Sequence, residues 1–299
     1  MHREERYGQA DRIVRFGFWA NAVLMVFKLL AGHFGHSEAV FADGVESACD
    51  FIAIGSTMIA LHIGRKPYDA DHPYGHGKAE SIAAILISLI ILVTGTGILV
   101  QAVRTIITAH YYTPQLMAVV AAIATIFIKE SLYRFTFKTG SSLQSPAILA
   151  IAKDHRKDAI TSIATVIGVS GAYFGVKIMD PLAAGVTSLF IFHIGIQTFL
   201  SAAHELMDAL PPPELLQQIT TKAEEIAGVE HVHEIRARRS GQYLIVDLKL
   251  DMDPAMTVKQ SHDISIDVKK KIFETFHNVG DVMIHINPHE EEHEDLIRL

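Results

Sequence analysis

Acidic side chains gather on one face of a predicted apolar helix. Asp43, Glu46, Ser47 and Asp50 occur at the start of a long apolar run, FADGVESACDFIAIGSTMIALHIG. On a helix that turns about 100° per residue, these four side chains fall within an arc of about 100°. A carboxylate at the centre of a bilayer costs about 2.5 to 3.5 kcal/mol on insertion scales, so several of them persist only beside a wet cavity or a bound positive charge. The stripe therefore predicts a cation site.

A second pair of acids lies further along the chain, in the charged cluster KDHRKD. Asp154 and Asp158 stand at i and i+4, so on a helix they share a face. Two helices that offer such oxygen ligands can close a tetrahedral cage, which suits Mn²⁺, Fe²⁺ or Mg²⁺, whereas Zn²⁺ usually takes at least one His or Cys. His155 is about 100° away from Asp154 and is expected to point off the site. The alternative is that both acids pair with the basic residues of the cluster at a cytoplasmic helix end.

The stretch RKPYDADHPYGHGKAE supplies a third candidate site in a turn that contains Gly and Pro. Asp69, His72 and His76 follow one another at spacings of three and four residues, which are residue types and spacings typical of metal ligands. Loops that contain His and Asp also occur without metals, so a metal site and a solvated loop both remain open.

Six segments are long and apolar enough to span a bilayer, and they must position these ligands. Their approximate bounds are 14–32, 40–63, 82–107, 115–135, 147–175 and 182–203. Lys and Arg occur in the N-terminal tail and in the second and fourth connections, whereas the HFGHS and AHYYT turns have none. By the positive-inside rule, both termini are predicted to be cytoplasmic in a multi-pass protein of the cell membrane.

The charged cluster leaves two interpretations of the fifth segment. Either the cytoplasmic loop ends at the cluster and the span begins at Ala159, or a single helix runs from Pro146 to Gly175. The second interpretation rests on the stretch AILAIA, which precedes the cluster, is apolar and contains no turn residue. It places Asp154 and Asp158 on one helix face.

The character of the chain changes after Asp208, where PPPELL marks a boundary because three prolines cannot continue a helix. Helical spacing at 214–227 and 258–276, and strand alternation at 233–239, 243–251 and 282–287, give the order αββαβ. This order predicts a small ferredoxin-like α+β domain with helices on one face of a sheet. We expect three parts: a transmembrane domain of six helices at 1–208, a cytoplasmic domain at 209–290 and an acidic, disordered tail at 291–299.

Histidines of the soluble part form a further candidate metal site. His233 and His285 fall on predicted strands and His262 on a predicted helix, so the three could converge. Each of them alone is more often a packed or surface histidine.

Composition narrows the range of partners. The whole formal net charge of −7 belongs to the part after Asp208, which argues against nucleic acid as a partner and favours a raised local concentration of cations. The single cysteine, Cys49, excludes a disulfide within the chain and is expected to pack inside an apolar helix. The charged N-terminus is followed by no cleavage site of small residues, so we expect no signal peptide.

Taken together, these motifs resemble those of the cation diffusion facilitator family of divalent-metal exporters. The resemblance rests on the order of six spans, the ADG start of the second, the D-x-x-H-x-x-x-H loop that runs into GHGKAES, the D-x-x-x-D of the fifth and the C-terminal DVMIHINP. It covers nearly the whole chain. It implies a homodimer that exchanges a metal ion for protons at a site between the second and fifth spans.

Carried over residue by residue, the resemblance implies a transport site at Asp43, Ser47, Asp154 and Asp158. The Asp/Asp pair of the fifth span is similar to that of members that favour manganese or iron. Ser47 is a weak ligand where zinc members have an acid. Either Asp50 or Glu46 compensates, or the site has only three strong donors.

The remaining sites of the family match to different degrees. The loop site falls on Asp69, His72 and His76 without change. In the cytoplasmic domain His233, His262 and His285 match ligands, but Lys249 and Asn287 stand where zinc members have His and Asp, which disfavours a full binuclear site. Lys78 and Asp208 match a pair that the family is thought to use to interlock the two protomers.

The favoured function is export of divalent metal ions, with Mn²⁺ or Fe²⁺ as the favoured substrate, and the sequence also allows other functions. A zinc or cadmium exporter of the same family would use the loop and cytoplasmic histidines for selectivity. A membrane sensor or scaffold that binds metal without transport is an alternative from a different class. An intramembrane hydrolase is disfavoured because G-x-S-x-G does not occur in the sequence and no positioned nucleophile is evident.

Overall fold

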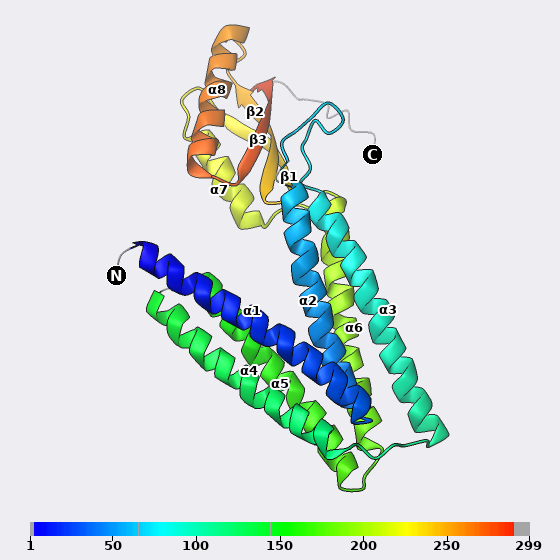
Figure 1. Cartoon of the computed structure of the whole chain (residues 1–299). Helices are drawn as coiled ribbons and strands as arrows, with labels where there is room; N and C mark the ends of the chain where they lie inside the picture. Colours follow the sequence, from blue (N-terminus) through cyan, green and yellow to red (C-terminus); the bar gives the residue numbers. More distant parts are fainter. Residues whose placement is uncertain (1–2, 65, 144, 290–299) are drawn as a thin grey trace. The chain divides into compact units, whose positions relative to one another are not determined.

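The structure is a computed structural model that describes residues 3–64, 66–143 and 145–289. Six long helices come first, followed by a small domain that contains a sheet (Figure 1). The helices are α1 (Arg3–Phe34), α2 (Glu38–Gly64), α3 (Ala79–Thr108), α4 (Leu116–Leu143), α5 (Pro146–Tyr173) and α6 (Met179–Leu206). The small domain contains α7 (Pro213–Glu224), β1 (His231–Ser240), β2 (Tyr243–Met252), α8 (Val258–Thr275) and β3 (Val279–Pro288). The predicted fold class is confirmed, and the expected tail at 291–299 lies outside the described residues.

The fifth helix is continuous, which decides between the two interpretations of the charged cluster. Ser145 caps α5, its side chain accepting a hydrogen bond from the backbone N–H of Ile148, and Pro146 occupies the first turn, where its missing N–H is no loss. Within the described residues five helices are long and apolar enough to cross a membrane, and α5 is not among them. The cluster KDHRKD places five charged residues near the middle of α5, and charged residues within a span oppose its insertion into a bilayer.

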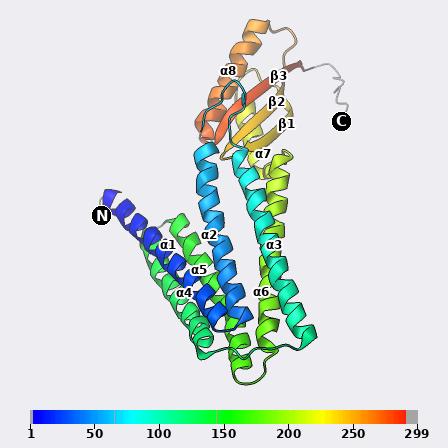
Figure 2. The same ribbon diagram turned by 45° about the vertical axis from the view of Figure 1, so that its right-hand side comes forward.

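Two compact units make up the chain, residues 1–55 with 86–199 and residues 56–85 with 200–299. In the first unit α1, α4 and α5 lie side by side, and α2, α3 and α6 form a second group (Figures 1 and 2). The first group packs small side chains of α4, such as Ala118 and Ala122, against Val169 of α5. The second group packs Cys49, Ile87 and Ile191 together, so the cysteine is buried as expected.

Glycines let α1 and α2 approach each other closely. A Cβ placed on Gly32 of α1 would lie 2.4 Å from the backbone nitrogen of Phe41 in α2. A Cβ on Gly44 of α2 would lie 3.1 Å from the Cβ of Lys28 in α1. This close approach brings Lys28 beside the acidic stripe of α2.

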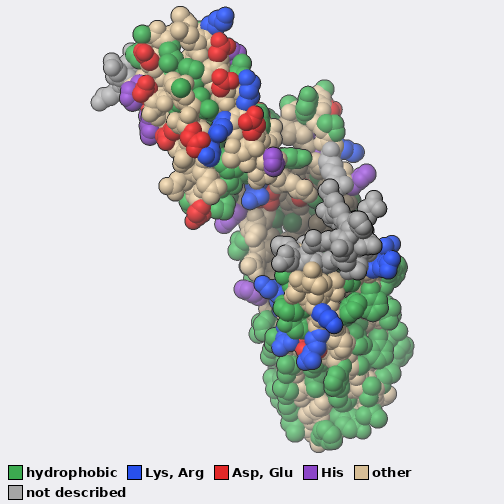
Figure 3. All heavy atoms as spheres, turned by 90° about the vertical axis from the view of Figure 1, so that its left-hand side faces the viewer, with side chains coloured by type: hydrophobic (Ala, Val, Ile, Leu, Met, Phe, Trp, Pro, Cys, Tyr) green, Lys and Arg blue, Asp and Glu red, His purple; other side chains and the backbone are tan. Residues whose placement is uncertain are grey.

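The outer surfaces of the long helices are apolar. Trp19, Val93 and Phe127 are among many large apolar side chains that are exposed on them. On the face shown in Figure 3, hydrophobic side chains cover most of the helical part, and charged side chains and histidines gather on the domain that contains the sheet. An apolar outer surface of this extent matches contact with lipid.

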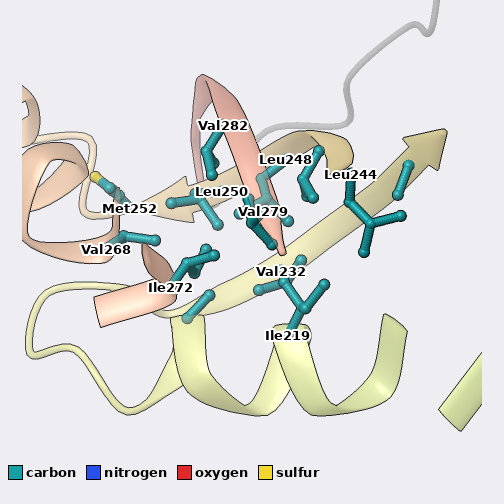
Figure 4. Packing of buried hydrophobic residues seen from close by; sticks show 13 residues of the cluster. Ile219, Val232, Leu244, Leu248, Leu250, Met252, Val268, Ile272, Val279 and Val282 are labelled. Atoms are coloured by element: carbon teal, nitrogen blue, oxygen red, sulfur yellow. The ribbon is translucent and has the colours of Figure 1, made fainter. Parts of the chain in front are cut away.

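The small domain has its own hydrophobic core. Its strands are ordered β1-β2-β3, with β1 and β2 antiparallel and β2 and β3 parallel. Ile219 of α7 and Val268 and Ile272 of α8 are fully buried against strand residues such as Leu248 and Leu250 (Figure 4). A capping box at Thr257 and Gln260 fixes the start of α8. The predicted αββαβ order is confirmed.

Replacing Gly32 by Ala tests the close approach of α1 and α2. We expect Gly32→Ala to destabilise the detergent-solubilised protein by about 1 to 3 kcal/mol, because the added methyl group overlaps the backbone of Phe41. The matched control is Gly97→Ala in α3, where a Cβ meets no atom within 4 Å. The Tm of each variant at one fixed heating rate is the measurement, and equal Tm values for the two variants would contradict the proposed close contact.

Candidate metal sites

The buried end of the acidic stripe on α2 is neutralised by a lysine of α1. Lys28 Nζ lies 3.0 Å from Asp43 Oδ2, donates to Ser47 Oγ at 3.1 Å and reaches the Asp43 carbonyl at 3.5 Å. The Lys28 and Asp43 side chains are only 2% and 5% exposed. Asp43 and Ser47 are both predicted as metal ligands, and in the structure both contact the ammonium group of Lys28.

Asp43 also joins α2 to α5. The hydroxyl of Ser162 donates to its two carboxylate oxygens at 3.2 and 3.4 Å. Ser162 lies one helical turn after Asp158, so the face of α5 that carries Asp158 contacts α2 at Asp43.

Asp158 is paired with a lysine of α4. Lys129 Nζ lies 2.6 Å from Asp158 Oδ2, with the lysine side chain 7% exposed and the aspartate side chain 29% exposed. Asp158 is therefore open to solvent to a degree that Asp43 is not.

Glu46 and Asp50 are the two other acids of the α2 stripe, and they differ from Asp43 in their contacts. Glu46 interacts electrostatically with Asp43, Asp50 and Asp158, and Asp50 interacts with Asp158. Among the residues that the structure describes, neither Glu46 nor Asp50 forms a hydrogen bond or an ion pair through its carboxylate. Asp154 is exposed on α5, one turn before Asp158.

Lys28, Lys129 and Ser162 contact the acids of the site and are not among the residues predicted for it from the sequence. A signal for the two lysines was present, because each interrupts an otherwise apolar span, and an ionisable residue in a span implies a partner of opposite charge. His155 is buried and a Cβ on Gly17 of α1 would lie 3.6 Å from its Nε2, so it packs toward α1, off the acidic face as expected.

The loop residues Asp69, His72 and His76 are close together. Their ligand atoms all lie within 4.8 Å of one another, and this is the one such trio in the described part of the chain. His76 Nδ1 lies 3.2 Å from the Pro67 carbonyl, which can only accept, so Nδ1 carries the proton and Nε2 is free to face Asp69. The backbone N–H of His72 donates to Asp69 and lowers the pKa of that carboxyl, so Asp69 is ionised at neutral pH.

The histidines of the small domain are spread over three elements. His233 on β1 has its Nδ1 3.6 Å from Asp251 Oδ2, and His262 lies on α8. His285 of β3 is the register partner of Lys249 on β2. Lys249 is ion-paired with Glu234 at 2.7 Å, and this contact lowers the pKa of Glu234. No trio of these histidines and acids reaches the ligand spacing of the loop within the described residues.

Lys78 and Asp208, which the resemblance pairs, are in contact within one chain. Lys78 Nζ donates to Asp208 Oδ1 at 2.5 Å and also reaches the Leu206 carbonyl. Arg238 approaches the other Asp208 oxygen at 3.8 Å. The pair therefore does not need a second protomer to form.

Comparison with known proteins now gives these sites a context. Residues 14–207 match the cation efflux transmembrane domain family, and residues 211–289 match the family of cytoplasmic domains of cation efflux proteins. The chain belongs to the cation diffusion facilitator family. It is therefore a multi-pass membrane protein of a family of metal efflux transporters, and the resemblance drawn from the motifs is confirmed.

Relatives of this transporter span most of its length. The manganese efflux system protein MneP of Bacillus subtilis is 35% identical over 96% of this chain and 99% of its own. Metal tolerance protein C1 of Arabidopsis thaliana is 34% identical over 94% of this chain and 63% of its own. The magnetosome protein MamB of Magnetospirillum gryphiswaldense is 30% identical over 93% of this chain and 94% of its own. A solved MamM CTD variant in a cadmium form is 26% identical, covers 26% of this chain and 98% of that chain, and has a TM-score of 0.26.

The loop trio gives a testable binding site in this transporter. We expect Asp69→Asn to weaken the binding of a metal ion to the loop at least about tenfold, because the carboxylate charge is lost while the side-chain volume is kept. Asp71→Asn in the same loop is the control, since Asp71 is outside the trio. Calorimetric titration of the purified full chain with Zn²⁺ and Mn²⁺ measures the effect. Unchanged binding in the Asp69 variant, or an equal loss in the control, would contradict the site.

Proposed function

We propose that this chain is a proton-coupled exporter that moves divalent metal ions out of the cytoplasm, with Mn²⁺ or Fe²⁺ favoured. The single observation that carries this proposal is the contact between α2 and α5 at their acidic residues, where the hydroxyl of Ser162 donates to Asp43. Glu46 and Asp50 follow Asp43 on the same face of α2, and Asp158 precedes Ser162 by one turn of α5. Anionic oxygens gathered between two helices repel one another unless a cation joins them. A divalent ion that passes between α2 and α5 is such a cation.

The α2 ligands in this proposal are Glu46 and Asp50 rather than Asp43 and Ser47. Lys28 binds both Asp43 and Ser47, and a hydrated ion has no open path to a carboxylate that is 5% exposed. Among the described residues, the carboxylates of Glu46 and Asp50 form no hydrogen bond or ion pair, and the nearby lysines act on them only electrostatically. On α5, Asp158 supplies the third carboxylate and Asp154, exposed one turn away on the same face, the fourth.

An oxygen-only donor set supports Mn²⁺ or Fe²⁺ as the substrate. These ions accept carboxylate ligands readily, whereas Zn²⁺ usually takes at least one His or Cys. His155 is the histidine nearest in sequence to the acids, and it packs against α1 instead. The relative MneP is named as a manganese efflux protein, which agrees with this preference.

Exchange with protons follows from competition for the same oxygens. Metal, proton and the Lys129 ammonium group all compete for Asp158, whose contact with Lys129 is 2.6 Å. Moving a divalent ion outward against an inside-negative potential costs about 4.6 kcal/mol per 100 mV, and each entering proton returns about 2.3 plus about 1.4 per pH unit. Two protons per metal therefore balance the charge and leave the pH gradient as the driving force.

The assembly proposed here is a homodimer with both termini in the cytoplasm. The match of residues 211–289 to a cytoplasmic domain family named ZT_dimer supports dimer formation through the small domain. The distribution of Lys and Arg among the connections supports the orientation.

Two alternatives have specific support. The loop trio contains two imidazoles, which favours Zn²⁺ or Cd²⁺ at that site and, with it, a zinc or cadmium exporter. A membrane sensor that binds metal without moving it would keep the loop trio and lack flux. Transport rates for Mn²⁺, Fe²⁺ and Zn²⁺, measured side by side in proteoliposomes, separate these functions.

Removing a proposed ligand tests the transport site. We expect Asp158→Ala to abolish metal-dependent proton flux in proteoliposomes, because the three remaining carboxylates, only one of them on α5, hold a divalent ion too weakly against water. Asp154→Ala should have the same effect. The control is Glu130→Gln on α4, an acid that is ion-paired with Arg134 and Arg156 and is outside the proposed ligand set. Wild-type flux in either aspartate variant would remove that residue from the site.

Association of the small domain tests the role of its negative charge. We expect the fragment 211–289 to dimerise at least about tenfold more tightly with Mn²⁺ than with EDTA, because bound cations relieve repulsion between two acidic domains. Sedimentation equilibrium measures the association, with K⁺ at matched ionic strength as the control for screening. Equal association in EDTA and Mn²⁺ would rule out regulation of dimer packing by metal.

A further inference from the structure

Lys28 makes three contacts inside the helical unit, and all of them are to α2. Its ammonium group reaches the carboxylate and the carbonyl of Asp43 and the hydroxyl of Ser47, and the side chain is 2% exposed. The Lys28 charge also acts electrostatically on Glu46 and Asp50. A single lysine thus lies in the field of every acid on the α2 stripe.

The two lysines inside this unit hold their partners differently. Lys129 pairs with Asp158, whose side chain is 29% exposed and can exchange its partner for an ion. Asp43 is 5% exposed and is held on its other side by the Ser162 hydroxyl, so its oxygens are enclosed by protein. Lys28 and Asp43 therefore form a fixed pair, and Lys129 and Asp158 an exchangeable one.

The pair of Lys28 and Asp43 lowers the net negative charge of the acidic stripe on α2. Glu46 is within electrostatic range of Asp43, Asp50, Asp158 and Lys28, and Asp50 is within range of Asp158 and Lys28. The ammonium group of Lys28 neutralises the negative charge of Asp43. The carboxylates that α2 can then offer to a metal ion are those of Glu46 and Asp50. Without Lys28, the carboxylate of Asp43 would be a further negative charge one helical turn from Glu46 and two turns from Asp50, and the site would hold a divalent ion more tightly than release allows.

We propose that Lys28 is a specificity-determining residue of the transport site. It keeps Asp43 out of the ligand set and lowers the negative charge around Glu46 and Asp50 to a value suited to binding and releasing one divalent ion. This inference rests on the proposed function in that it takes Glu46, Asp50 and Asp158 as the metal ligands.

The proposal predicts effects of opposite sign for the two partners of the pair. Lys28→Met leaves Asp43 as an added free carboxylate, so Mn²⁺ binding should tighten about tenfold while the maximal transport rate falls. Asp43→Asn leaves the ammonium group uncancelled beside Glu46 and Asp50, so Mn²⁺ binding should weaken about tenfold. The double variant Lys28→Met with Asp43→Asn restores the charge and should return within about threefold of wild type. Lys138→Met, at an exposed lysine of α4, is the control and should leave binding unchanged.

The experiment uses the full chain with the loop site removed by His72→Ala and His76→Ala in every arm. Titration with Mn²⁺ in detergent gives the Kd of the site, defined as the binding that Asp158→Ala abolishes, and proteoliposomes give KM and kcat. A purely structural ion pair would lower the Tm of both single variants and leave the Kd of the folded protein within about twofold of wild type. That result, or a shift of the same sign in both single variants, would overturn the proposal.

Failure of the proposed function gives a different pattern. Wild-type protein that binds Mn²⁺ at this site without transporting it would refute export, and the Kd values would still decide the role of Lys28. Wild-type protein with no Mn²⁺ binding that depends on Asp158 would overturn both. If Lys28→Met alone does not fold, Asp43→Asn and the double variant still provide the comparison, because a return of Kd in the double variant is the decisive result.

Discussion

Charge buried among apolar helices has to meet charge of the opposite sign, and this constraint determines the inside of the helical unit. Lys28 and Lys129 come from different helices, and each meets an aspartate at 3.0 Å or less. Removing one member of a buried pair costs about 3 to 5 kcal/mol, so these contacts also fix how α1 and α4 pack against α2 and α5. The acidic site and the packing of the helices around it are thus one arrangement. Gly32 and Gly44 make it possible, because only residues without a Cβ let α1 come close enough to place Lys28 beside Asp43.

Most of the fold could be predicted from the sequence because its signals are local. Apolar length gives five of the six long helices, and alternation and spacing after Asp208 give the order αββαβ. The continuity of α5 could not be predicted from the sequence, because the cluster KDHRKD is compatible both with a loop and with a polar face of a helix. The structure distinguishes the two by the contacts of Asp158 with Lys129 and of Ser162 with Asp43. The loop trio was recovered because its ligands are adjacent in sequence and a short turn brings them together.

Which acids of α2 are open to an ion could not be predicted, because the answer depends on other helices. Asp43 and Asp50 stand on nearly the same line of α2, and no property of that helix alone distinguishes them. The distinction comes from Lys28 on α1 and Ser162 on α5, which enclose Asp43. The sequence does contain both lysines, and an ionisable residue inside a span is itself a prediction of a partner. Pairing each lysine with a particular acid still requires the packing of the helices.

The same contacts connect selectivity with coupling. A site made only of free carboxylates would bind a divalent ion tightly and release it slowly, and a site without net charge would not attract one. In the proposed exporter, the lysine side chains give the site a net negative charge between these two limits. They are covalently part of the chain, so they lower the charge without being carried away with the ion. In the proposed transport cycle, Lys129, which contacts Asp158 at 2.6 Å, neutralises that carboxylate until an ion or a proton takes its place, so the empty site leaves no unpaired charge inside the membrane. An exporter that returns through its metal-free state in every cycle needs this compensation as much as it needs its ligands.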